Sequence, residues 1–163
     1  MNAQRIVVPL DGSALAEAAV PKAIEIASAT PGANITLVRA AEATVFPGRD
    51  PIAAQIAVIE EAETYLERVE ARLPHDNIPM KRSVWYGPAA MAIVEAAEAA
   101  HADLIVMSTH GRSGLNRLVL GSVAESVVRA THVPILLLRP ETAPVDRPVR
   151  RAEQAPDKEA AHV

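Results

Sequence analysis

The feature of this 163-residue chain that most limits its fold is a regular alternation of short apolar runs with longer helical patterns. The apolar runs predict five strands, at residues 5–10, 34–40, 80–85, 103–108 and 133–138. The segments between them predict helices, at residues 14–29, from after Pro51 to 73, 89–100 and 122–131. Strands that alternate with helices are typical of a parallel sheet with right-handed crossovers. The pattern therefore predicts an α/β protein.

The polarity of each run predicts the order of the strands in that sheet. Run 80–85 contains Lys81, Arg82 and Ser83, as expected of an edge strand, whereas 104–107 is continuously apolar, as in a strand covered on both faces. We expect a doubly wound, Rossmann-like sheet of five strands in the order 3-2-1-4-5. Ligands of such sheets bind outside the carboxyl ends of the strands where the winding reverses, here between strands 1 and 4. Asp11 and residues 108–111 leave those two ends.

Three local patterns predict how the helices begin and which face they bury. Asp11-Gly-Ser13 predicts a turn and a cap for the first helix. Ser122 and Glu125 have the spacing of a capping box, with Ser122 as the N-cap. In the long second helix, apolar residues at spacings of three, four and seven predict one continuous buried stripe, formed by Ile52, Ile56, Ile59, Leu66, Val69 and Leu73.

Composition narrows the class of protein. Hydrophobic residues make up 50% of the chain but aromatic residues only 2%, so the core is expected to be aliphatic. The absence of cysteine excludes disulfide scaffolds and thiolate metal sites. A net charge of −4 and scattered aromatic residues disfavour a nucleic-acid partner. No apolar run approaches the roughly 20 residues of a membrane span, and none resembles an export signal, so we expect a cytoplasmic location.

The composition changes near residue 139. Residues 140–163 contain four prolines, mixed charges and few large apolar residues. Such a segment buries too little surface to offset its ordering entropy. We therefore expect a folded domain at residues 1–139 and a disordered tail at 140–163, with a docking arm as the alternative for the tail.

Residues 107–122, Met-Ser-Thr-His-Gly-Arg-Ser-Gly-Leu-Asn-Arg-Leu-Val-Leu-Gly-Ser, concentrate glycines and hydroxyls between a strand and a helix. Glycine allows a backbone N–H to approach an anion closely, and a helix N-terminus adds unpaired N–H groups and a favourable dipole. The segment therefore predicts phosphate binding, and nucleotide binding is the leading hypothesis.

The same segment resembles the nucleotide-binding signature of the universal stress protein family, G-x-x-G, nine residues, then G followed by S or T. Here it runs as 108–111, the nine residues 112–120, and Gly121-Ser122. Residues 7–13 are similar to that family's first strand and turn, and residues 121–138 to its last helix and strand, so the resemblance covers roughly residues 4–139. Ser108 replaces the first signature glycine. If that position needs a left-handed backbone, binding would weaken by about 1 kcal/mol or somewhat more.

The resemblance implies an adenine nucleotide alpha hydrolase-like fold that binds ATP, with Mg or Mn bound through the phosphates, and a homodimer formed through strand 133–138. It places Pro9, Leu10 and Asp11 on the adenosine side, Ala40 at the adenine, and Met107 at the base or ribose. Around the ribose and phosphates it places Ser108, Thr109, His110, Gly111, Arg112, Ser113 and Gly114. The helix amides expected at the phosphates belong to Gly121, Ser122, Val123 and Ala124. The dimer has independent support, because residues 135–138 form an apolar edge without a charge.

Several of these residues have a simpler structural interpretation. Asp11 either contacts the nucleotide or only caps the first helix, and Ser122 as N-cap is compatible with phosphate contact. His110 is typical of a loop residue before a glycine rather than of a catalytic group. Met107 is expected in the core with one edge facing the pocket.

The sequence does not indicate an obvious catalytic apparatus. It contains no G-x-x-x-x-G-K-[ST] loop, no nucleophile elbow and no evidently placed carboxylate pair. The absence of these features predicts slow or no hydrolysis, and the resemblance implies an ATP-binding, nucleotide-responsive protein with a regulatory or stress-resistance role. Two alternatives stay open: an ATPase or nucleotidyl-transfer enzyme on the same fold, and a nucleotide-free protein-interaction module.

Overall fold

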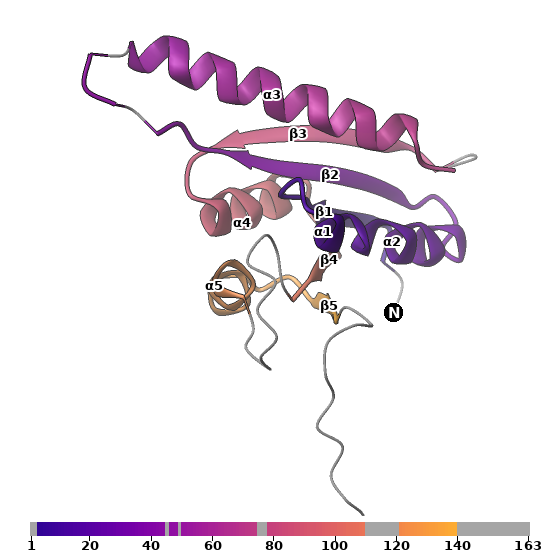
Figure 1. The fold of residues 1–163 in the computed structure, drawn as a ribbon. Helices are drawn as coiled ribbons and strands as arrows, with labels where there is room; N and C mark the ends of the chain where they lie inside the picture. Colours follow the sequence, from indigo (N-terminus) through magenta and orange to yellow (C-terminus); the bar gives the residue numbers. More distant parts are fainter. Residues whose placement is uncertain (1–2, 45, 49, 75–77, 110–120, 140–163) are drawn as a thin grey trace, which may run out of the picture.

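The computed structural model describes residues 3–44, 46–48, 50–74, 78–109 and 121–139. Its strands form one five-stranded parallel sheet in the order β3-β2-β1-β4-β5 (Figure 1). The strands are β1 (Arg5–Pro9), β2 (Asn34–Ala41), β3 (Met80–Tyr86), β4 (Leu104–Ser108) and β5 (Ile135–Leu138). The predicted class, strand order and edge position of β3 are confirmed.

Helices cover both faces of the sheet. They are α1 (Ala14–Glu17), α2 (Ala19–Ser28), α3 (Pro51–Ala71), α4 (Ala89–Ala99) and α5 (Ser122–Ala130). Successive side chains of a strand point to opposite faces, so Ile6 and Val8 of β1 pack with α2 and α3, whereas Val7 packs with α4 and α5. Both cores are largely aliphatic, as the composition predicts.

The helix predicted at residues 14–29 is wrong in one respect, because it is two helices that meet at Ala18. Pro21 explains the break. Its nitrogen has no hydrogen to donate to the Glu17 carbonyl four residues earlier, and its ring crowds that carbonyl. The first turn, α1, is thereby separated from the rest of the helix.

The continuous apolar stripe predicted for α3 is also wrong. Leu66 and Val69 are buried, but Ile52 and Ile56 are 67% and 50% exposed. The helix begins at Pro51, one residue inside the predicted loop, because the Asp50 carboxylate accepts a hydrogen bond from the Ile52 N–H at 2.9 Å. In Figure 1 the first turns of α3 extend past the tips of β2 and β3, so the sheet offers them no surface to pack on.

One ionic contact fixes the opposite end of the sheet. Asp103, just before β4, accepts hydrogen bonds from the Arg5 side chain and from the Arg5 and Gln4 N–H groups at 2.8–3.2 Å.

Within the described residues, no helix is both long and apolar enough to cross a bilayer.

Candidate functional site

The reversal of winding in the sheet lies between β1 and β4, where Ile6 pairs with Leu104 and Val7 with Ile105. After β1 the chain turns towards α1 and β2, and after β4 it continues to α5 and β5 on the other side. A pocket of about 400 Å³ opens at the carboxyl ends of these strands. This is the place that the predicted topology indicates for a ligand.

The predicted site residues that the structure describes all line this pocket. They are Pro9, Leu10 and Asp11 after β1, Ala40 of β2, Met107, Ser108 and Thr109 around the end of β4, and Gly121, Ser122, Val123 and Ala124 at the start of α5. The other predicted residues, His110, Gly111, Arg112, Ser113 and Gly114, lie outside the described residues. Segments distant in sequence therefore meet around one cavity.

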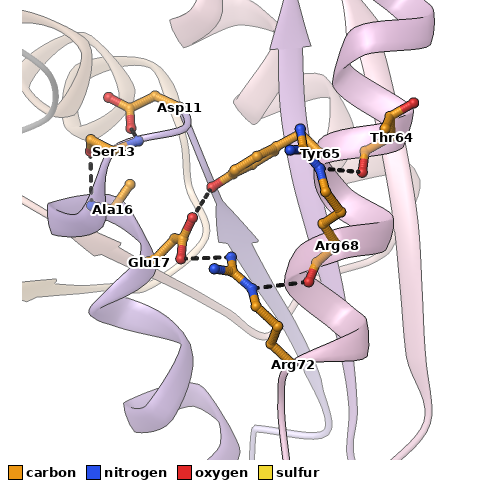
Figure 2. Close-up of polar contacts among 8 residues, drawn as sticks. All are labelled: Asp11, Ser13, Ala16, Glu17, Thr64, Tyr65, Arg68 and Arg72. Carbon is orange, nitrogen blue, oxygen red and sulfur yellow. Dashed lines mark hydrogen bonds and ion pairs between the residues drawn. The ribbon is translucent and has the colours of Figure 1, made fainter.

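Asp11 lies in a tight turn that positions it at the pocket. Its carboxylate accepts a hydrogen bond from the Ser13 N–H at 2.9 Å, and the Ser13 hydroxyl accepts one from the Ala16 N–H at 3.1 Å (Figure 2). Between them Gly12 has φ 87°, which suits glycine. Ser13 is thus the cap of α1, while Asp11 orders the turn before it and also lines the pocket.

The start of α5 differs from the prediction. Gly121, not Ser122, is the N-cap, and Ser122 is the first helical residue, so the capping box is wrong. The Gly121 N–H donates to the Thr109 carbonyl at 2.8 Å, which holds Gly121 just outside the helix. Glu125 instead accepts hydrogen bonds from Arg129, at 2.8 Å for the shorter one. A residue without a side chain therefore precedes the first amides of this helix.

Thr109 connects this helix to the sheet through its main chain. Its N–H donates to the carbonyl of Leu138, the last residue of β5, at 2.9 Å, and its carbonyl accepts from Gly121. The ends of β4 and β5 and the beginning of α5 are thereby held together beside the pocket.

Ser108 does not need the conformation that glycine favours. It is the last residue of β4, and among the described non-glycine residues only His101 has a positive φ. The loss of binding expected for a left-handed serine therefore does not arise. Met107 is 5% exposed, packs in the core beneath α4 and α5 and also lines the pocket, as predicted.

Among the described lining residues, sequence reasoning missed five: Ala16, Val38, Arg39, Ala89 and Ile93. Arg39 had a usable signal, because it is a charge within an otherwise mostly apolar strand. Its side chain is 12% exposed, lies 3.6 Å from Glu61 and stacks 4.4 Å from the centre of the Tyr65 ring. The other four are small or aliphatic and have no signal that separates them from core residues.

The pocket combines apolar walls with a few polar groups. Leu10, Val38 and Met107 are each at most 5% exposed and supply apolar surface, which suits a flat aromatic ring. The amides at the start of α5 supply hydrogen-bond donors and the positive end of a helix dipole, which suit a phosphate. Within the parts of the chain that the structure describes, no three acidic, histidine or cysteine side chains are grouped to hold a metal ion.

Comparison with known proteins gives a consistent result. A model of the Universal stress protein family matches residues 2–139. Universal stress protein MJ0531 of Methanocaldococcus jannaschii is 34% identical over 141 residues, covering 83% of this chain and 82% of that protein. The solved structure of MJ0577, from the same organism, superposes with a TM-score of 0.72 at 23% identity and covers 87% of this chain and 99% of its own. A universal stress protein solved in complex with cAMP has a TM-score of 0.60 at 24% identity, covering 85% and 98%.

Proposed function

Because this chain belongs to the universal stress protein family, we propose that it binds an adenine nucleotide, principally ATP, in the pocket between β1 and β4. The observation that carries the proposal is the pocket itself. It lies at the topological switch point and joins apolar walls from β1, β2 and β4 to the N-terminus of α5. A related protein of the same fold in complex with cAMP supports an adenine nucleotide as the class of ligand.

Each part of the pocket has a role in this proposal. The base would lie among Leu10, Val38 and Met107, near Ala40 at the end of β2. The phosphates would lie towards α5, where Gly121 presents no side chain and the helix amides point outwards. Residues 110–114, which lie outside the described part, are proposed to complete the ribose and phosphate contacts. A Mg or Mn ion would bind through the phosphates and screen their charge.

We propose that the protein acts in regulation or stress resistance and responds to nucleotide occupancy. Hydrolysis of the bound nucleotide would be slow or absent. Among the described lining residues Asp11 supplies a carboxylate, and this carboxylate already accepts a hydrogen bond from the Ser13 N–H. Its arrangement favours holding the turn over activating a water molecule. Rapid turnover of Mg-ATP would instead support the enzyme alternative, and absence of any bound nucleotide would support the interaction module. The cytoplasmic location and the boundary at residue 139 stay predictions.

The direct test is mass spectrometry of nucleotide that co-purifies with the protein, together with calorimetric titration of Mg-ATP. We expect Gly121→Asp to lower the affinity at least about tenfold, because a carboxylate there repels the phosphates. Gly121→Ala is the matched control, since φ at this position is −58° and alanine adopts it without strain. Unchanged ATP affinity in folded Gly121→Asp would place the phosphates elsewhere.

We also propose a homodimer through β5. This strand forms one edge of the sheet, and its four residues, Ile135, Leu136, Leu137 and Leu138, are all apolar and only half-buried. Exposed apolar edges favour pairing with another strand, and two-fold symmetry is the commonest closed arrangement. We expect a dimer in sedimentation velocity, and a monomer for Leu137→Lys. A wild-type monomer at high concentration would contradict the dimer.

A further inference from the structure

The one-turn helix α1 carries part of the pocket and is joined to α2 at the break before Pro21. It has four residues, follows directly from the Asp11 turn, and includes Ala16, which lines the pocket. Ala18, between α1 and α2, keeps a helical conformation with φ −61° and ψ −16°. Pro21 nevertheless removes the hydrogen bond to the Glu17 carbonyl that a continuous helix would have. Contacts with other elements therefore contribute to the position of this turn.

Ala16 of this turn packs in the core, and Glu17, the last residue of α1, adds polar contacts. One oxygen of its carboxylate accepts a hydrogen bond from the Tyr65 hydroxyl at 2.9 Å, and the other accepts one from Arg72 at 3.1 Å. Figure 2 shows Tyr65 of α3 and Arg72, the residue directly after α3, reaching to Glu17, with Asp11 and Ser13 on the preceding turn. The hydrogen bond between Tyr65 and Glu17 thus connects this turn to α3, 48 residues later in the sequence.

Tyr65 contacts a second wall of the pocket as well. Its ring is 9% exposed and lies beneath the Arg39 guanidinium, 4.4 Å from the ring centre. Arg39 precedes Ala40 at the end of β2, and both line the pocket. Burial and then the Glu17 carboxylate raise the pKa of Tyr65, and the opposing effect of the Arg39 guanidinium is smaller, so the hydroxyl remains a neutral donor. One side chain therefore joins the α1 wall to the β2 wall.

We infer that Tyr65 and Glu17 are positioning residues for the nucleotide site, an inference that rests on the proposed function. They hold the Asp11 turn and the end of β2 in a fixed relation, so that the adenosine part of the ligand meets a preformed pocket. Neither residue lines the pocket. Their effect on binding is therefore indirect and should be confined to the nucleoside end, away from α5.

The test is calorimetric titration of Tyr65→Phe with two probes, Mg-ATP and adenosine. Loss of one hydrogen bond predicts a decrease in affinity of about three- to tenfold. The decrease should be the same for Mg-ATP and for adenosine. Tyr86→Phe is the matched control, because it loses the same hydroxyl from an exposed tyrosine outside the pocket. Gly121→Asp provides the converse pattern, since it should weaken Mg-ATP but not adenosine.

Two variants of Glu17 separate positioning from a general structural role. Glu17→Ala removes the acceptors of both Tyr65 and Arg72 and should weaken binding at least as much as Tyr65→Phe. The single amide oxygen of Glu17→Gln still accepts from Tyr65, so this variant should restore the part of the affinity that depends on the tyrosine. A Tyr65→Phe protein that unfolds at lower temperature but binds both probes as the wild type does would overturn the inference. Failure of the wild type to bind either probe would instead overturn the proposed function.

Discussion

The uneven burial of α3 leads to a sharp prediction about stability. Leu66 is 0% exposed and packs in the core with β1 and β2, whereas Ile52 on the same helix is 67% exposed. Leu66→Ala and Ile52→Ala each shorten an aliphatic side chain to the same residue. Only the first leaves a void in a close-packed interior.

The expected magnitude follows from the burial. Leu66→Ala removes three buried carbon groups, worth about 2.4 kcal/mol at about 0.8 kcal/mol each. The residual cavity raises the loss of unfolding free energy to about 3–4 kcal/mol, which lowers the melting temperature by roughly 6–16 °C. Ile52→Ala should stay within about 0.5 kcal/mol of the wild type, because its site is exposed and alanine favours the helix.

Urea unfolding followed by far-UV circular dichroism measures the free energy of unfolding of the wild type and of both variants. The slope of free energy against urea should be the same in all three proteins, so that the midpoints report stability. Equal losses for the two variants would refute the reasoning, since they would mean that the first turns of α3 are as buried as its last turns.

Three further predictions concern the helix cap and the titrating groups. Asp50→Ala removes the acceptor for the Ile52 N–H and should cost about 1 kcal/mol, with faster amide hydrogen exchange in the first turn of α3 than in its last. The hydrogen bond from Arg5 is the main cause that lowers the pKa of Asp103 below its usual 3.8. The ionised Asp103 therefore stabilises the fold above pH 3.8, and this stabilisation is lost as the pH falls through the folded-state pKa. Asp103→Asn should therefore flatten the acid limb of unfolding free energy against pH, and an unchanged acid limb would contradict it. Burial, followed by the hydrogen bond to Glu17, raises the pKa of Tyr65 above its usual 10.0. The neutral Tyr65 hydroxyl therefore contributes fully to stability below pH 10.0, and its contribution declines above that pH. In Tyr65→Phe the alkaline loss of stability should be smaller, as measured by urea midpoints across that range.

Much of the fold was predictable because its signals are local and periodic. The apolar runs marked the strands, and alternation within β1 sends Ile6 and Val8 to one face and Val7 to the other. The polar run at 80–85 marked the edge strand. The break after α1 was also present in the sequence, since Pro21 removes a hydrogen bond in any helix that spans it.

Other features depend on contacts that periodicity does not encode. Apolar spacing identified the face of α3 that contains Ile52, but not the point at which the sheet beneath it ends. The cap of α5 lies at Gly121 because of a hydrogen bond to Thr109, and that pairing depends on the tertiary fold. Local spacing therefore favoured Ser122.

The candidate site was predictable to the extent that it lies at strand ends. The carboxyl ends of parallel strands share one edge, so the order of the strands is enough to bring Asp11, Ala40 and Ser108 together. Ala89 and Ile93 of α4 were not predictable, because only the packing of that helix brings ordinary core residues to the cavity. Arg39 was predictable only in part, since its charge within the strand is apparent from the sequence but its contact with the Tyr65 ring is not.

The two hydrogen bonds of Thr109 to Leu138 and Gly121 use main-chain atoms only. Replacing a side chain leaves an amide and a carbonyl in place, so scanning this junction with alanine would leave both bonds able to form. Removal of the amide hydrogen itself, by proline or by an ester in the backbone, is required to open it. Sequence variation at position 109 therefore says little about how much the junction contributes.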